Sequence, residues 1–198
     1  MGQYKLIAIV GEAGSGKDSL ANALVDQLND EGIQAHKVVT YTTRPPRDYE
    51  TNGIDYYFTP DDLMVKLILQ DKIIEAAEFN GWIYGTNIDD LKPDCVNIEI
   101  LSPEAIETIS QDDRINIFIL GCRCNDKTRL IRQLLREDDP DVNEIIRRFS
   151  ADKRDFSDFE MTHCSHNYGI IYTDSGLSIS EEAAEAVNLV RSWAEEDK

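Results

Sequence analysis

The segment from Gly11 to Ser19, GEAGSGKDS, is the feature that most restricts how this chain can fold. It follows a continuous apolar run, LIAIV at 6–10, and leads into a segment with leucines at positions 20, 24 and 28. Leucines four residues apart lie on one face of a helix, so the order is buried strand, glycine-rich turn and helix. A phosphate-binding loop of the form G-x4-G-K requires this context, and the segment matches its spacing. The alternative is a glycine-rich turn that binds nothing.

The chemistry of such a loop assigns a role to each position. Backbone N–H groups close around phosphate oxygens, and the N-terminus of the following helix adds its positive dipole end. The motif places a hydroxyl for Mg²⁺ directly after the lysine, but here Asp18 stands there and Ser19 follows one residue later. A carboxylate can ligate Mg²⁺ directly or hold its water shell, so Asp18 is the predicted metal ligand, with Ser19 as the alternative. The predicted nucleotide-phosphate ligands are Gly11, Ala13, Gly14, Ser15, Gly16, Lys17, Asp18 and Ser19.

The composition excludes several classes of partner. The chain has 198 residues, a formal net charge of -18 and a pI near 4.4, which argues against a nucleic-acid surface or an anionic membrane as partner. No segment reaches the ~18 apolar residues of a membrane span and the N-terminus lacks a signal-peptide pattern, so we expect a cytoplasmic protein. Its four cysteines include no second pair to complete a zinc site and are expected to be reduced and structural.

Apolar runs of strand length alternate with helical patterns, which predicts a single α/β domain built on a doubly wound parallel sheet. Between residues 40 and 92 the pattern changes to a small α+β insertion, with a helix at 61–70 and a hairpin turn at Asn80-Gly81. Leu63, Leu67 and Ile68 are expected to face inward from that helix. The strands of the main sheet are predicted at residues 5–10, 33–40, 95–101, 115–120 and 168–173.

The insertion begins with a polar, aromatic segment at 42–58 that is suited to holding a phosphate. Arg44 and Arg47 are three residues apart and can present forked donors to a dianionic phosphate, with the hydroxyls of Tyr56 and Tyr84 as neutral donors. The alternative is a surface arginine pair with structural tyrosines.

The segments 42–58 and 74–86 together resemble the guanylate kinase family. That family shows T-T-R-x-P-R and E-x-x-G-x-x-Y-x-F, followed later by E-x-A and G-x-x-Y-G-[ST]. The spacings agree within and between the blocks, and the resemblance weakens after about residue 95. The matching residues are Thr42, Thr43, Arg44, Pro46, Arg47, Glu50, Gly53, Tyr56, Phe58, Glu75, Ala77, Gly81, Tyr84, Gly85 and Thr86.

The resemblance implies a P-loop NTPase fold. This is a three-layer α/β/α domain with a central parallel sheet, an inserted α+β subdomain that binds a nucleoside monophosphate, and a helical lid. The implied boundaries are a core at 1–39, 93–124 and 156–198, a nucleotide-binding subdomain at 40–92 and a lid at 125–155.

The resemblance also implies the acceptor ligands. It makes Arg44, Arg47, Tyr56 and Tyr84 the ligands of the GMP phosphate, and it places Glu75, Thr86 and Thr40 around guanine. On the strand at 95–101 the family carries an acidic L-D-I-D-like element, where this chain has Asn97 and Glu99. Asn97 is an acceptor and a donor and can bond more than one base. Glu99 is either a base or metal neighbour or a plain strand-end carboxylate.

In the lid, Arg132, Arg136 and Arg148 match arginines that fold over the triphosphate. Together with Lys17 and Arg44 they are the implied catalytic residues, because cations that arrive on closure stabilise the transferring phosphoryl group. The alternative is ordinary helix-surface arginines with partners four residues away.

These features predict an enzyme that uses ATP and Mg²⁺ to convert GMP or dGMP to the diphosphate. Two alternatives stay open: a monophosphate kinase of different or broader base specificity, favoured by Thr40 and Asn97, and a non-catalytic guanylate-kinase-like binding module. The intact phosphate loop and the arginines argue against the second. The sequence carries no signal for an oligomeric state.

Overall fold

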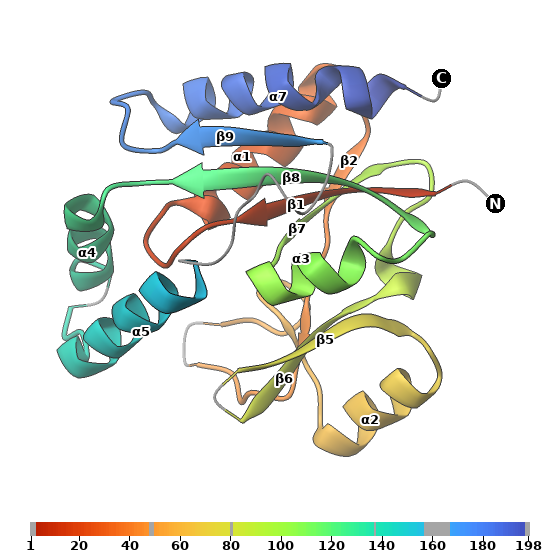
Figure 1. Ribbon diagram of the computed structural model, residues 1–198, viewed down its shortest axis with the longest axis horizontal. Helices are drawn as coiled ribbons and strands as arrows, with labels where there is room; N and C mark the ends of the chain where they lie inside the picture. The colour runs from red at the N-terminus through yellow and green to blue at the C-terminus, as the bar shows by residue number, and fades with distance from the viewer. Residues whose placement is uncertain (1–2, 48–49, 80, 137, 157–166, 197–198) are drawn as a thin grey trace.

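A five-stranded parallel sheet forms the centre of the computed structural model, which describes residues 3–47, 50–79, 81–136, 138–156 and 167–196 (Figure 1). The strand order is β2-β7-β1-β8-β9. Leu6, Ile7, Ala8 and Ile9 of the middle strand are fully buried, as expected for a strand covered on both faces. The strands are β1 (Tyr4–Val10), β2 (Ala35–Lys37), β7 (Val96–Ile100), β8 (Ile115–Arg123) and β9 (Tyr168–Tyr172).

Helices cover both faces of this sheet. The alternating side chains of β1 divide the core: Ile7 and Ile9 pack with α1 (Lys17–Asp30) and α7 (Ile179–Glu195), whereas Leu6 and Ala8 pack with α3 (Pro103–Ile109) on the opposite face. The predicted three-layer α/β/α arrangement is therefore confirmed. It puts the loop after β1 at the carboxyl edge of the sheet, where open α/β sheets bind ligands.

A second, four-stranded sheet lies beside the first, in the order β4-β3-β6-β5 (Figure 1). Its β5–β6 hairpin turns at Gly81, which has a positive φ of 79°. A Cβ at Gly85 of β6 would lie 2.8 Å from the Glu75 carbonyl oxygen, so only glycine fits there. All these elements lie between residues 40 and 92. The exact limits of the subdomain stay a prediction. They are β3 (Tyr41–Thr42), β4 (Tyr57–Phe58), α2 (Asp61–Leu69), β5 (Ile73–Phe79), β6 (Trp82–Asn87) and the 3₁₀ helix η1 (Ile88–Asp90).

Two details differ from the sequence predictions. The strand expected at 33–40 is only three residues long, because the chain leaves the main sheet after Val38 bonds to Ile98 and then joins the second sheet. The buried face of α2 centres on Met64, whereas Leu63 is 43% and Ile68 37% exposed. The prediction was wrong for Leu63 and Ile68, while Leu67, three residues after Met64 on the same helical face, is half-buried.

Two further helices follow β8 and lie near the loop after β1 (Figure 1). They are α4 (Asp126–Leu134) and α5 (Val142–Asp155), and each begins with a side-chain cap, from Asn125 and from Asp141. In the described ranges no helix is long and apolar enough to cross a membrane. The three cysteines in those ranges are free, and Cys164 lies outside them.

Candidate active site

The phosphate loop leaves the carboxyl end of β1 and runs into α1. Helix α1 begins at Lys17 with Gly16 as its N-cap in the left-handed region, at φ 94°. Asp18 and Ser19 therefore lie in the first turn, and both are exposed. The Lys17 Nζ lies 3.5 Å from the Glu12 carbonyl oxygen, so the ammonium group stays at the loop. The loop thus combines a helix N-terminus with a cation, which suits an anionic ligand.

Arg44, the first of the two predicted phosphate-binding arginines, is held in place by Glu50. Its Nη2 donates to both oxygens of Glu50, at 2.8 and 2.9 Å, and its Nη1 donates to the Pro45 carbonyl at 2.8 Å. Glu50 also accepts from the Arg47 backbone N–H at 2.8 Å and pairs with the Arg47 guanidinium at 3.6 Å. Burial raises the pKa of Glu50 but the two arginines lower it further, and the net direction is downward. One ionised carboxylate thus orients both arginines.

Two tyrosines complete this cluster because strand pairing brings them together. Tyr84 lies opposite Thr42 on the paired strands β6 and β3, and Tyr56 directly precedes β4. The two rings meet edge to face with centroids 5.9 Å apart, and the Arg44 guanidinium lies 5.4 Å from the Tyr56 ring. Burial raises the pKa of Tyr56 to about 12, with smaller contributions from Tyr84 and Asp18. The Tyr56 hydroxyl therefore remains a donor at neutral pH, within electrostatic range of the first turn of α1.

A second cluster joins the two sheets and contains the predicted base ligands. Glu75 and Thr86 are cross-strand partners on β5 and β6, and Glu99 reaches them from β7 of the main sheet. The Thr86 hydroxyl lies 3.0 Å from a Glu75 oxygen and 2.9 Å from a Glu99 oxygen, and the Thr40 hydroxyl donates to Glu99 at 2.9 Å. Both carboxyl groups are at least 95% buried. The structure thus assembles four groups from four separate segments.

Burial favours the protonated form of the two carboxyl groups in this cluster. A threonine hydroxyl has one hydrogen, so Thr86 can donate to only one of its two carboxyl neighbours. The other contact is a hydrogen bond only if that carboxyl group carries its own proton and donates to Thr86. Burial raises the pKa of Glu75 to about 7 and that of Glu99 to about 8, the latter with a contribution from the Glu75 charge. A ligand that brings N–H donors would favour the ionised carboxylates, so its binding would release a proton from this pair to the solvent.

Asn97 is a correction to the predicted set. It is fully buried, its amide oxygen accepts from the Lys92 N–H at 2.8 Å, and its amide nitrogen donates to the carbonyls of Lys5 and Lys92 at 3.0 Å and of Cys95 at 3.2 Å. Backbone groups around the start of β7 and on β1 take up both hydrogens of its amide and one lone pair of its oxygen. Asn97 therefore has a structural role in this arrangement and has no free N–H to donate to a base.

The three lid arginines are not gathered over the phosphate loop. Arg132 donates to the Thr173 carbonyl at 2.7 Å and to the Ser15 carbonyl at 3.3 Å, on the outside of the loop. Arg148 donates to Glu144 of its own helix at 2.6 Å, and Arg136 is exposed near the end of α4. Their contact with a triphosphate stays a prediction.

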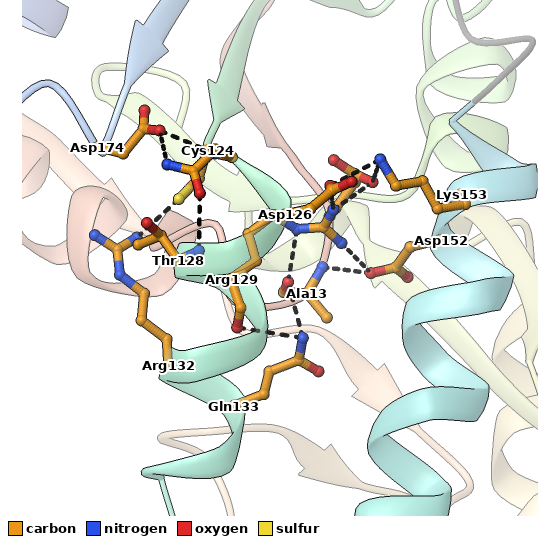
Figure 2. A network of polar contacts seen from close by, with 12 residues as sticks. Ala13, Cys124, Asp126, Thr128, Arg129, Arg132, Gln133, Asp152, Lys153 and Asp174 are labelled. Atoms are coloured by element: carbon orange, nitrogen blue, oxygen red, sulfur yellow. Dashed lines mark hydrogen bonds and ion pairs between the residues drawn. The ribbon is translucent and has the colours of Figure 1, made fainter.

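Sequence reasoning did not foresee the contacts of three residues that shape the site, Glu50, Glu99 and Arg129. Glu50 stands three residues after Arg47, and an i,i+3 charge pair is a usable signal. The carboxyl group of Glu99 was considered, but nothing in the sequence shows that it meets Thr86. Arg129 of α4 gives no signal at all, although it is fully buried beside the phosphate loop (Figure 2).

The residues at the start of α1 fit a magnesium ion. Mg²⁺ prefers carboxylate oxygens and water, and it is usually held by one or two carboxylates together with substrate phosphates. Asp18 is exposed in the first turn, directly after the phosphate loop, and acts electrostatically on Tyr56 of the arginine–tyrosine cluster. Its carboxylate thus lies at the end of the phosphate loop and within electrostatic range of the arginine–tyrosine cluster.

The raised pKa values predict how the stability of the ligand-free protein depends on pH. A buried carboxyl group with a raised pKa stabilises the fold below about pH 4.5, and this contribution is lost as the pH rises through 7 to 8. Between pH 5.5 and 8.5 the Tm of the wild type should fall by on the order of 5 °C more than that of Glu99→Gln, which cannot ionise. Scanning calorimetry measures this. Glu78→Gln, on the exposed side of β5, should keep the wild-type slope, and equal slopes for all three proteins would contradict the account.

Comparison with known proteins agrees with this geometry. The family model described as guanylate kinase matches residues 3–160. A guanylate kinase of Maricaulis maris is 29% identical over 96% of this chain and 88% of its own length, and one of Schizosaccharomyces pombe is 39% identical over 43% of this chain and 41% of its own. The fold is similar to that of a crystal structure of guanylate kinase from Anaplasma phagocytophilum, with a TM-score of 0.64, 20% identity and coverage of 98% and 88%. The chain belongs to the guanylate kinase family.

Proposed function

We propose that this phosphotransferase moves the γ-phosphoryl group of ATP to GMP or dGMP and that it works with Mg²⁺. The observation that carries the proposal is the presence, in one chain, of a phosphate loop, an arginine–tyrosine cluster and a buried carboxyl pair at the junction of the two sheets. The first suits a triphosphate, the second a monophosphate, and the third a base with N–H donors. The names of the related proteins point to the same reaction.

The carboxyl pair supports guanine as the acceptor base. Guanine presents N1–H and an exocyclic amine as adjacent donors and O6 as an acceptor, whereas adenine has no such pair of donors. The ionised carboxylate of Glu75 can accept both donors, and the hydroxyls of Thr86 and Thr40 can donate to O6. Thr40 and Asn97 were the two features that favoured a broader base specificity. Because the amide of Asn97 bonds to the backbone, only Thr40 still supports that alternative.

Arg44 suits the acceptor phosphate. Its Nη2 hydrogens go to Glu50 and one Nη1 hydrogen goes to the Pro45 carbonyl, and Tyr84 also hydrogen-bonds to the guanidinium. A guanidinium fixed in this way loses little entropy when it binds a phosphate oxygen. Arg47 and the two tyrosine hydroxyls would supply the remaining donors.

Catalysis would then rest on positioning and on charge neutralisation. A phosphate oxygen of GMP is already a nucleophile, so the reaction needs no general base. Lys17 and the loop would hold the triphosphate, and Asp18 would hold the magnesium ion, which supplies charge neutralisation between the phosphates when it is bound. Closure of the lid would bring Arg132, Arg136 and Arg148 toward the transferring group and exclude water.

The test of this function is ATP-dependent diphosphate formation with GMP, dGMP, AMP, dAMP, CMP, UMP and dTMP, each with and without Mg²⁺. We expect kcat/KM for GMP or dGMP to exceed that for AMP by at least ~10³-fold, because adenine cannot offer the buried carboxyl pair two adjacent donors. Coupled measurement of ADP gives the rates. Comparable rates with AMP and GMP would remove the role of Glu75, and no turnover with any acceptor would favour a binding module.

Arg44→Ala separates the two nucleotide sites. We expect the KM for GMP to rise on the order of 10- to 100-fold, since the charge-assisted bonds to phosphate are lost, while the dissociation constant for ATP stays within about twofold. Arg44→Lys keeps a positive charge opposite Glu50 but loses the forked donors of the guanidinium. Its KM for GMP should lie between those of the wild type and Arg44→Ala. Steady-state kinetics and calorimetric titration with ATP measure both effects. An equal loss of GMP and ATP binding in Arg44→Ala would contradict the assignment.

A further inference from the structure

One face of α4 lies against the outside of the phosphate loop. Arg129 donates from Nε to the Ala13 carbonyl at 3.1 Å, and Gln133 donates to the same oxygen at 3.3 Å (Figure 2). Arg132 donates to the Gly14 carbonyl at 3.4 Å. Residues three and four positions apart share one helical face, so a single surface of α4 supplies these donors. The carbonyl groups of Ala13 and Gly14 are thus held by α4 on the outside of the loop.

Arg129 is the centre of this contact. Its side chain is fully buried, and it pairs with Glu12 at 2.6 Å, Asp126 at 3.1 Å and Asp152 at 3.3 Å, with the Phe149 ring 4.8 Å from the guanidinium. A buried arginine is strongly destabilising without partners, so three carboxylates around one guanidinium account for its position. Figure 2 shows Asp126 of α4, Asp152 of α5 and Ala13 of the loop around Arg129.

The same network fixes the backbone of the loop from two directions. Asp152 of α5 accepts from the Ala13 N–H at 2.6 Å, while Arg129 takes the Ala13 carbonyl. Next to it, Gly14 has a φ of 77°, and a Cβ there would lie 2.5 Å from the Arg129 carbonyl oxygen. The backbone of α4 is therefore in direct contact with the loop, and the peptide units on both sides of Ala13 are fixed by α4 and α5.

The network also controls charge at the loop. Glu12 belongs to the phosphate loop itself, and an unpaired carboxylate there would repel a triphosphate. Arg129 and Lys153 balance most of the charge of Glu12, Asp126 and Asp152, with Lys153 Nζ 2.7 Å from Asp126. Arg129 is buried, whereas Lys153 is exposed, so solvent screens the charge of Arg129 less than that of Lys153.

We propose that Arg129 is a positioning residue for the triphosphate of ATP: it fixes the Glu12–Gly14 part of the phosphate loop, neutralises Glu12, and links the loop to α5 through Asp152. The proposal rests on the proposed function only in naming ATP as the ligand. Arg129 itself touches the loop and not the nucleotide. Its loss therefore affects ATP and leaves the arginine–tyrosine cluster and the carboxyl pair unchanged.

The test is the ATP dissociation constant of Arg129→Gln, measured by calorimetric titration without acceptor at 50 and 500 mM salt. We expect binding to weaken roughly tenfold or more at low salt and less at high salt, because the repulsion from the freed carboxylates is then screened. The KM for GMP should stay within about twofold of the wild type. Arg114→Gln, which removes an exposed arginine paired with Asp112 at 2.7 Å, is the control and should change neither value.

Two more variants distinguish positioning from folding. Glu12→Gln in the Arg129→Gln background removes the repelling charge and should restore most of the lost ATP affinity. Arg129→Lys keeps the charge but not the fork and should show a smaller loss, which serves as the test if Arg129→Gln does not fold. The proposal is overturned if Arg129→Gln and Arg129→Lys both bind ATP within twofold of the wild type. It is also overturned if Arg129→Gln weakens GMP and ATP binding equally, or if the double variant binds ATP no more tightly than Arg129→Gln alone. ATP affinity is measured without acceptor. If the wild type fails to turn over GMP, that result therefore contradicts the proposed function and not the role of Arg129.

Discussion

The arrangement of the candidate site depends on one hydroxyl group placed between two buried carboxyl groups. Thr86 and Glu75 belong to the second sheet and Glu99 belongs to the main sheet, so their contacts join the two sheets. The low-dielectric surroundings make these contacts strong but also keep a proton on the pair. The junction is therefore stable without a ligand. When a base with N–H donors binds, the pair can ionise and release that proton to the solvent.

A second constraint is the need to hold cations in place within a very acidic chain. Arg44 is buried against Glu50, and Arg129 is buried among Glu12, Asp126 and Asp152. In each case a carboxylate reduces the local positive charge but fixes the direction of the guanidinium. The chain with a net charge of -18 thus uses its excess of carboxylates to orient its few arginines, and affinity for phosphates comes from orientation as much as from charge.

The sequence was most informative where a local pattern determines local structure. The phosphate loop, the parallel sheet and the hairpin at Gly81 follow from apolar runs and turn residues, and the family resemblance placed Arg44, Tyr56, Tyr84, Glu75 and Thr86 in segments that the structure brings together. It was least informative for contacts between distant segments. Asn97 looks like a ligand in its motif, yet backbone groups take up both hydrogens of its amide. The roles of Glu99 and Arg129 depend on which distant segments of the chain pack beside them, and no spacing rule in the sequence predicts this packing.

The proton held by the carboxyl pair offers the most direct test of this account. Calorimetric titration with GMP at pH 7.5, repeated in buffers of different ionisation enthalpy, counts the protons released on binding. We expect the wild type to release on the order of half a proton more than Glu99→Gln, because guanine donors favour the ionised carboxylates. The same count for both proteins would contradict the account, since it would mean that the base does not meet the pair.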